Sequence, residues 1–182
     1  MSADQNLPAR TERKASPIRP AAPDIPEPSA LLRKALDVML NPMVEVPHSD
    51  GSNHLSARAL PALPTSIRDE AETMLAAVRS AVTAGEITAN DLIAWLGPVA
   101  LGVRNPMPAT DLPTFTAVLE FALEDIPRSV LSRETQRQAL RTWRFFPSVA
   151  EVYELLAPPA KQWVAQRDAL MGLLSQATWV EG

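Results

Sequence analysis

The sequence WRFFPSVAEV, residues 143–152, determines how the helices of this chain follow one another. Two phenylalanines and a proline come directly after Trp143 and its arginine, which is typical of a turn anchored by aromatic side chains. Ser148 and Glu151 then stand three positions apart, the spacing of a capping box in which each side chain binds the other residue's backbone amide. We therefore predict that one helix ends near Trp143, that the chain turns, and that another helix begins near Val149.

The aromatic side chains of this turn are expected to divide between core and surface. Trp143, Phe146 and Val149 are apolar residues at the junction of two helices, so we predict that they enter the core. Phe145 is adjacent to Phe146 and cannot easily point the same way. We therefore predict that Phe145 is exposed and available to contact a partner.

The composition predicts a helical protein with one folded domain. The chain has 182 residues, of which 46% are apolar, and this is enough for a substantial core. Glycine is scarce (6 residues) and proline abundant (18 residues), so prolines are expected to mark the helix ends. We predict an all-α fold, a single irregular orthogonal bundle of five or six helices over residues 65–178. A kink or break is expected at residues 97–98, a break at residues 157–159, and no strand. N-caps of further helices are expected at Thr88 and Ser132.

Residues 1–64 are predicted to form a flexible, Pro-rich arm in front of this domain. No hydrophobic period organises residues 1–28, whose prolines lie among charged and small residues. One short amphipathic helix is expected from Ala30 to Leu40, with Ser29 as its N-cap. A single helix of this length is marginal in water, so it must dock. It can dock on the protein's own body, or it can act as a tethered recognition helix for a partner through Leu31, Leu32, Val38 and Met39.

No catalytic or cofactor-binding motif appears in the sequence. There is no Gly-rich phosphate-binding loop, no Gly-x-Ser-x-Gly nucleophile elbow, and no cysteine to serve as nucleophile or thiolate ligand. Both histidines, His48 and His54, fall in a polar segment predicted to be a solvated loop, and they form no recognised set of metal ligands. We therefore predict that the chain is not an enzyme and holds no cofactor and no metal.

The sequence also predicts a cytoplasmic protein. No apolar run approaches the roughly 20 residues of a membrane span, and the first residues lack the apolar core of a signal peptide. The net charge of −4 predicts no global attraction to nucleic acid, so any contact with DNA has to be local.

One local charge pattern stands out before the aromatic turn. Residues 127–144 contain five arginines and one acid, a local charge of +4, whereas residues 111–125 contain four acids and no basic residue. The arginines at 133, 137, 141 and 144 are spaced four, four and three, which places them on one side of a helix. We name Arg133, Arg137, Arg141, Arg144 and Phe145 as candidate contacts with DNA or with an acidic protein partner. The alternative is a solvated face that pairs with the acidic stretch.

Residues 144–152 also carry a resemblance to a known class of proteins. The motif Arg144-Phe145-Phe146-Pro147-Ser148-Val149-Ala150-Glu151-Val152, preceded by a helix with regular arginines, resembles one found in small phage and prophage replication proteins. These are helicase loaders of the lambda replication protein P kind and of the loader-and-inhibitor kind. The resemblance covers roughly residues 111–156 and is specific over about ten positions.

This resemblance implies a non-enzymatic DNA-replication accessory protein. Its role would be that of a helicase-loader-like adaptor of phage or prophage origin, with a replicative helicase as its partner. In such loaders the helical domain and the helicase-binding segment tend to lie at opposite ends of the chain, whereas here the arm comes first and the helical body last. The alternative is a helical protein–protein interaction or regulatory module of a mobile element with no replication role. The sequence leaves the oligomeric state open.

Overall fold

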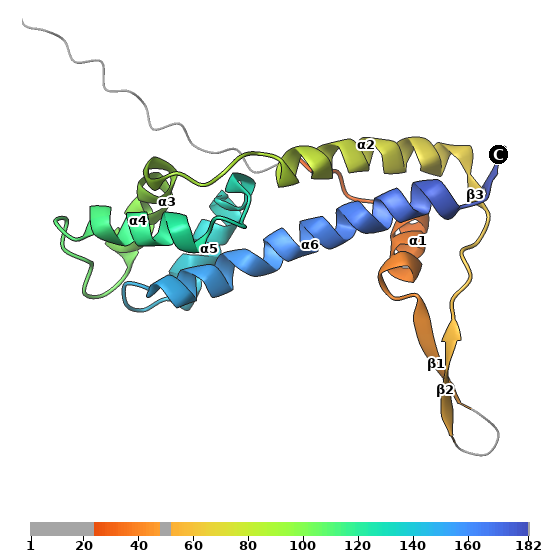
Figure 1. Cartoon of the computed structure of the whole chain (residues 1–182), viewed down its shortest axis with the longest axis horizontal. Coiled ribbons are helices and arrows are strands. Elements are labelled where there is room, and N and C mark those ends of the chain that lie inside the picture. The colour runs from red at the N-terminus through yellow and green to blue at the C-terminus, as the bar shows by residue number, and fades with distance from the viewer. Residues whose placement is uncertain (1–23, 48–51, 182) are drawn as a thin grey trace, which may run out of the picture.

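The computed structural model describes residues 24–47 and 52–181 (Figure 1). His48 and most of the predicted Pro-rich segment, residues 1–23, lie outside the described residues. The described part of the chain is mostly helical. Its elements are α1 (Ala30–Leu40), β1 (Met43–Pro47), β2 (Asn53–Ala57), β3 (Leu63–Pro64), α2 (Thr65–Val82), α3 (Ala89–Gly102), α4 (Leu112–Ala122), η1 (Arg128–Val130), α5 (Arg133–Thr142), α6 (Val149–Gln176) and β4 (Trp179–Val180).

The long helix α6 runs along most of the molecule, and the other helices are arranged along it (Figure 1). It has 28 residues, which corresponds to a length of about 42 Å. Helices α3, α4 and α5 surround its first half, whereas α1 and α2 pack along its second half. The buried apolar side chains accordingly form two clusters instead of the single predicted core.

The two clusters meet at one side chain of α6. The first core lies between α3, α4, η1, α5 and the first half of α6, and it includes Trp95, Leu119, Trp143 and Leu156. The second core lies between α1, β3, α2 and the second half of α6, and it includes Leu32, Leu63, Met74 and Leu170. Trp163 is half-buried and packs against both clusters. The two halves of the molecule, each built around one of these cores, are therefore joined by a continuous helix and a shared indole ring.

Most helix starts agree with the capping prediction. The hydroxyl of Ser29 accepts a hydrogen bond from the amide of Leu32, and Ser132 caps α5. Reciprocal capping boxes begin α3, at Thr88 and Asp91, and α6, at Ser148. From the sequence, Thr65 or Ser66 is also a candidate N-cap for α2, but the helix begins at Thr65 itself, after Pro64, without a side-chain cap.

The predicted break at residues 157–159 is wrong as well. Helix α6 continues through Pro158 and Pro159, although neither proline can donate a backbone hydrogen bond. Proline inside a helix costs about 3 kcal/mol, but each half of α6 is buried in its own core. This packing outweighs the local cost. Helix α3 passes through Pro98 in the same way.

The predicted absence of strands is also incorrect. β1 and β2 pair antiparallel from Met43–Ala57 to Pro47–Asn53, and β3 pairs parallel with β4 near the end of the chain. The β1–β2 hairpin projects away from the helices (Figure 1) and is largely exposed, with only Val46 and Ser56 half-buried. The fold is therefore mostly α with two small sheets, and not all-α.

Residues on both sides of the predicted boundary at 64/65 contribute to the second core. Leu32, Ala35 and Leu63 are fully buried beside Met74 of α2 and Leu170 of α6. The backbone amide of Ser29 donates to the carboxylate of Glu70 at 2.6 Å, which ties the start of α1 to α2. The division into an arm and a helical domain remains a prediction, and the second core is the place to test it.

Candidate binding face

Helix α5 presents three arginines on one exposed side. Arg133, Arg137 and Arg141 recur every four residues and are exposed, whereas Thr135 and Ala139 form the buried side of the helix. Arg144 comes directly after Trp143, the C-cap of α5, and is also exposed. We call these four residues, Arg133, Arg137, Arg141 and Arg144, the arginine face. The structure thus exposes all four arginines that the sequence singles out, three of them along one side of α5 and the fourth just after its end.

Hydrogen bonds in both directions fix α5 against α3. The indole Nε1 of Trp95 donates to the backbone oxygen of Ser132 at 3.2 Å, and the side-chain amide Nε2 of Gln136 donates to the backbone oxygen of Trp95 at 2.7 Å. The rings of Trp95 and Trp143 meet edge to face, 6.2 Å between centroids. Because α5 is held at its start, middle and end, the arginine face lies on a rigid support.

The aromatic turn after α5 is anchored by α3 and α4. The amide of Arg104 donates to the backbone oxygen of Arg144 at 2.7 Å, and Arg104 forms an isolated parallel bridge with Phe145. Phe146 is half-buried and packs edge to face on Phe115, 5.3 Å between centroids. Phe145 is 57% exposed, as predicted. This turn therefore holds an aromatic ring in solvent beside the arginine face.

Arg104 is a cation of this region that the sequence analysis missed. It is exposed, and its backbone is joined to that of Arg144 and Phe145. The two segments are 40 residues apart in the chain, and only the packing of α3 against α5 brings them together. No local sequence pattern could have placed Arg104 there.

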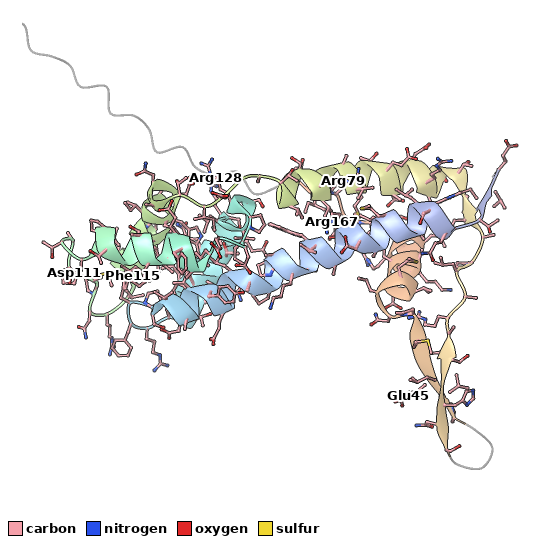
Figure 2. The ribbon with its side chains drawn as sticks, in the orientation of Figure 1. Glu45, Arg79, Asp111, Phe115, Arg128 and Arg167 are labelled. Atoms are coloured by element: carbon pink, nitrogen blue, oxygen red, sulfur yellow. The ribbon has the colours of Figure 1, made fainter. Side chains whose placement is uncertain are left out.

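No ion pair neutralises the arginine face within residues 24–47 and 52–181. The alternative prediction, pairing with the acidic stretch 111–125, is therefore not realised in this part of the chain. Arg128, labelled in Figure 2, behaves differently: it donates to the buried carboxylate of Asp91 at 2.6 Å. The charges of the arginine face thus remain available to a partner.

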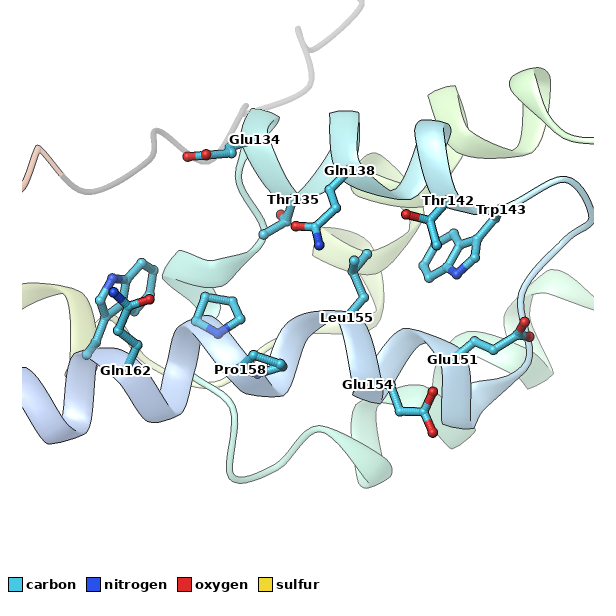
Figure 3. Close-up of a pocket in the computed structure, with 12 residues that line it drawn as sticks. Glu134, Thr135, Gln138, Thr142, Trp143, Glu151, Glu154, Leu155, Pro158 and Gln162 are labelled. Carbon is cyan, nitrogen blue, oxygen red and sulfur yellow. The ribbon is translucent and has the colours of Figure 1, made fainter.

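A groove of about 690 Å³ lies between α5 and α6 (Figure 3). Gln138 of α5 and Leu155 of α6 point into the space between the two helices. Three carboxylates line the groove, those of Glu134, Glu151 and Glu154, and its lining contains no lysine, arginine, histidine, serine or cysteine. A second hollow, of about 530 Å³, is lined by Glu134, Arg137, Gln138 and Arg141, so the arginine face borders the groove. This lining offers acidic groups for charge recognition.

Glu151 links this groove to the start of α6. Its carboxylate accepts hydrogen bonds from the backbone amide and the hydroxyl of Ser148, both at 2.8 Å. These bonds, the backbone one foremost, hold the pKa of Glu151 below its ordinary value. The charged form of Glu151 is therefore part of the capping box that the sequence analysis predicted.

The predicted recognition helix α1 lies against the protein's own body. Leu32 and Val38 are buried, Met39 is half-buried, and Leu31 is 38% exposed. Leu32 and Val38 therefore do not present their side chains to solvent, and of the four predicted contact residues Leu31 is the most accessible. Of the two alternatives left open by the sequence, the structure has α1 docked on α2 and α6.

Two further features of the described residues concern metals and membranes. No group of three or more His, Asp or Glu side chains in this part of the chain is arranged to hold a metal ion. His54 lies in β2, within the exposed hairpin. Among the helices of the described ranges, none combines the length and the apolar character that crossing a membrane requires.

Comparison with known proteins adds no relative to these observations: no family model, no curated protein and no solved structure matches this chain.

Proposed function

We propose that this chain is a non-enzymatic DNA-replication accessory protein, a helicase-loader-like adaptor of phage or prophage origin, which acts by binding. The observation that carries the proposal is the arginine face beside Phe145. Its four guanidinium groups are exposed and form no ion pair within the described residues, and a 57% exposed aromatic ring follows directly. Arginine and aromatic residues are the types most enriched at the energetic centres of protein interfaces.

The position of this face supports the link to helicase loaders. Arg144 and Phe145 belong to the motif of residues 144–152 on which the resemblance rests. The remaining residues of that motif serve the fold, since Phe146 packs on Phe115 and Ser148 caps α6. The side chains of Arg144 and Phe145 are exposed, and we expect them to contact the partner, a replicative helicase. A cytoplasmic location follows from this role as part of the proposal.

An acidic protein surface suits this face better than the phosphates of DNA. Glu134 lines the same hollow as Arg137 and Arg141, and the groove next to it carries Glu151 and Glu154. A continuous phosphate backbone that follows α5 would have to pass these carboxylates as well as the arginines, whereas separate acidic side chains can be placed opposite the arginines alone. A protein partner can place its own acidic groups opposite the arginines and its apolar groups on Phe145.

Affinity capture tests the proposed function. The tagged full-length chain is incubated with a bacterial lysate at low salt, and the captured proteins are identified by mass spectrometry. We expect the hexameric replicative helicase to be recovered. A capture experiment that repeatedly recovers no helicase would refute the helicase-loader role, and recovery of other proteins through the same arginines would favour an interaction module with no replication role.

A gel-shift experiment separates a protein partner from DNA. Single- and double-stranded DNA are titrated with the wild type and with R137E/R141E. We expect weak binding to both DNA forms. Tight binding by the wild type that falls by about tenfold or more in the variant would instead assign the arginine face to phosphates.

A further inference from the structure

The outer side of α4 exposes large apolar side chains that nothing in the described chain covers. Phe121 is 77% exposed and Val118 is 49% exposed, whereas Thr116 and Leu119 form the buried side of the same helix. Exposed apolar side chains that lie together on one helix are typical of a surface that binds another protein. Neither residue was among the candidate contacts predicted from the sequence.

Two carboxylates border this apolar surface. Glu120 lies on α4 itself and Glu124 follows two residues after its end; both are exposed, and neither forms an ion pair or a side-chain hydrogen bond within residues 24–47 and 52–181. Asp125, in contrast, accepts a hydrogen bond from the hydroxyl of Tyr153 at 3.2 Å. Lys161 lines the same hollow as Glu124 without pairing with it. We call Val118, Phe121, Glu120 and Glu124 the α4 face.

The arginine face has the opposite charge and its own apolar border. Leu140 lies one residue before Arg141 and is 41% exposed, and Phe145 comes directly after Arg144. Each of the two faces thus combines a row of charges of one sign with exposed apolar side chains. Within the described chain these two faces do not pair with each other, although their charges are complementary.

We propose that the α4 face of one copy of this protein docks on the arginine face of a second copy. In this contact Glu120 and Glu124 lie opposite Arg137 and Arg141, while Phe121 covers the apolar surface of Leu140 and Phe145. Complementary charges fix the orientation of such a contact, and the apolar side chains supply the buried area. Because two different surfaces meet, the contact is heterologous.

This contact goes beyond the proposed adaptor function, because it would regulate how much of the protein is free to bind the partner. The second copy and the proposed partner would use the same arginines, so self-association would compete with partner binding. The α4 face takes no part in the proposed partner contact. Variants of the α4 face therefore test self-association alone.

A charge-swap experiment on the full-length chain provides the test. The mass in solution is measured by light scattering and sedimentation over a range of concentrations at low salt. We expect the wild type to exceed its monomer mass of 19.8 kDa as concentration rises. R137E/R141E alone and E120R/E124R alone should each associate at least about tenfold more weakly. An equimolar mixture of the two variants should associate again, because each supplies the charge that the other lacks.

Two controls complete the design. E27R/E181R makes the same change in net charge at exposed acidic residues far from α4 in the sequence and should associate like the wild type. F121A keeps all charges and should weaken association as well. A wild type that stays at 19.8 kDa at every concentration, or a mixture no heavier than its separate variants, would overturn the proposal. Helicase capture by E120R/E124R, with its arginine face intact, shows separately whether the adaptor function fails.

Discussion

The two cores of this protein are built in different ways from the same helix. The first core takes its buried residues from one continuous part of the chain, between Ile87 and Ala160. The second core joins Leu32 and Leu63, from early in the chain, to Leu170 and Leu173, from its last helix. The first core can therefore form by local contacts, whereas the second requires the two ends of the described chain to meet.

The surfaces of the two halves of the molecule also differ. The first core carries both charged faces, the arginine face on α5 and the α4 face, and the aromatic turn between α5 and α6. The second core is covered by α1 and by the short pairing of β3 with β4. Both proposed binding surfaces therefore lie on the first half of the molecule, and the contacts between the early and late segments of the chain lie in the second.

The largest loss of stability is expected from a substitution in α1 that disrupts the second core. Leu32 is fully buried against α2 and α6, so Leu32→Asp places a carboxylate among apolar side chains. We expect the free energy of unfolding to fall by about 4 kcal/mol or more, measured by urea denaturation. Leu31→Asp, the neighbouring and exposed position, is the matched control and should change it by about 0.5 kcal/mol or less. Equal effects at the two positions would mean that α1 does not dock as described.

A pair of leucines on α6 sharpens the comparison between the cores. Leu156 and Leu170 are both fully buried, the first in the first core and the second in the second. Each leucine-to-alanine change should cost about 2–5 kcal/mol. Amide hydrogen exchange distinguishes them: Leu156→Ala should loosen α3 and α5 most, and Leu170→Ala should loosen α1 and α2 most. Identical exchange patterns would show that the two clusters behave as one core.

The start of α6 gives a smaller effect that depends on pH. Ser148→Ala removes the hydroxyl of the capping box and should cost about 1 kcal/mol. Because folding lowers the pKa of Glu151, the stability gained from its charge is present above the ordinary glutamate pKa and is lost as the pH falls through the lowered value. Glu151→Ala should therefore lower the Tm at neutral pH, and this difference from the wild type should vanish in acid. A difference that stays constant down to low pH would contradict the role of the carboxylate.

The helix boundaries were largely predictable because their signals are local. Ser29, Thr88, Ser132 and Ser148 each lie at a helix start with a side-chain cap, and such a cap depends on residues within one turn. The exposure of Phe145 was predictable for a similar reason, since the adjacent Phe145 and Phe146 cannot easily point the same way. The burial of Trp143 was predictable because it is an apolar residue at the junction of two helices.

The continuity of α6 was not predictable from local signals. Pro158 and Pro159 predict a break, and only the two cores on either side of them hold the helix together. The β1–β2 hairpin was missed because its strands are short and mostly exposed, so that no buried face marks them. In the sequence, Asp50-Gly51 is a dipeptide that is common in hairpin turns.

The candidate site was predictable in part for the same reason. The arginine face follows from the spacing of residues on one helix, which a sequence displays directly. Arg104 and the groove between α5 and α6 depend on contacts between segments far apart in the chain. The exposure of Phe121 could not be predicted from residue type, because apolar residues on a helix usually belong to the core.

The smallest expected effect on stability belongs to the arginine face itself. Arg137 and Arg141 are exposed and form no ion pair within the described residues, so R137E/R141E should change the free energy of unfolding by about 0.5 kcal/mol or less. Thermal and urea unfolding check this directly. A large loss of stability would mean that these side chains support the fold.

The central claim, that the first half of the molecule binds through its arginine face, is tested most directly by calorimetric titration with a purified bacterial replicative helicase. R137E/R141E is compared with R33E/K34E, which reverses two exposed charges on α1 in the second half. We predict that the wild type and R33E/K34E bind alike and that R137E/R141E binds at least about tenfold more weakly. Equal affinities for all three proteins, or a loss confined to R33E/K34E, would contradict the account.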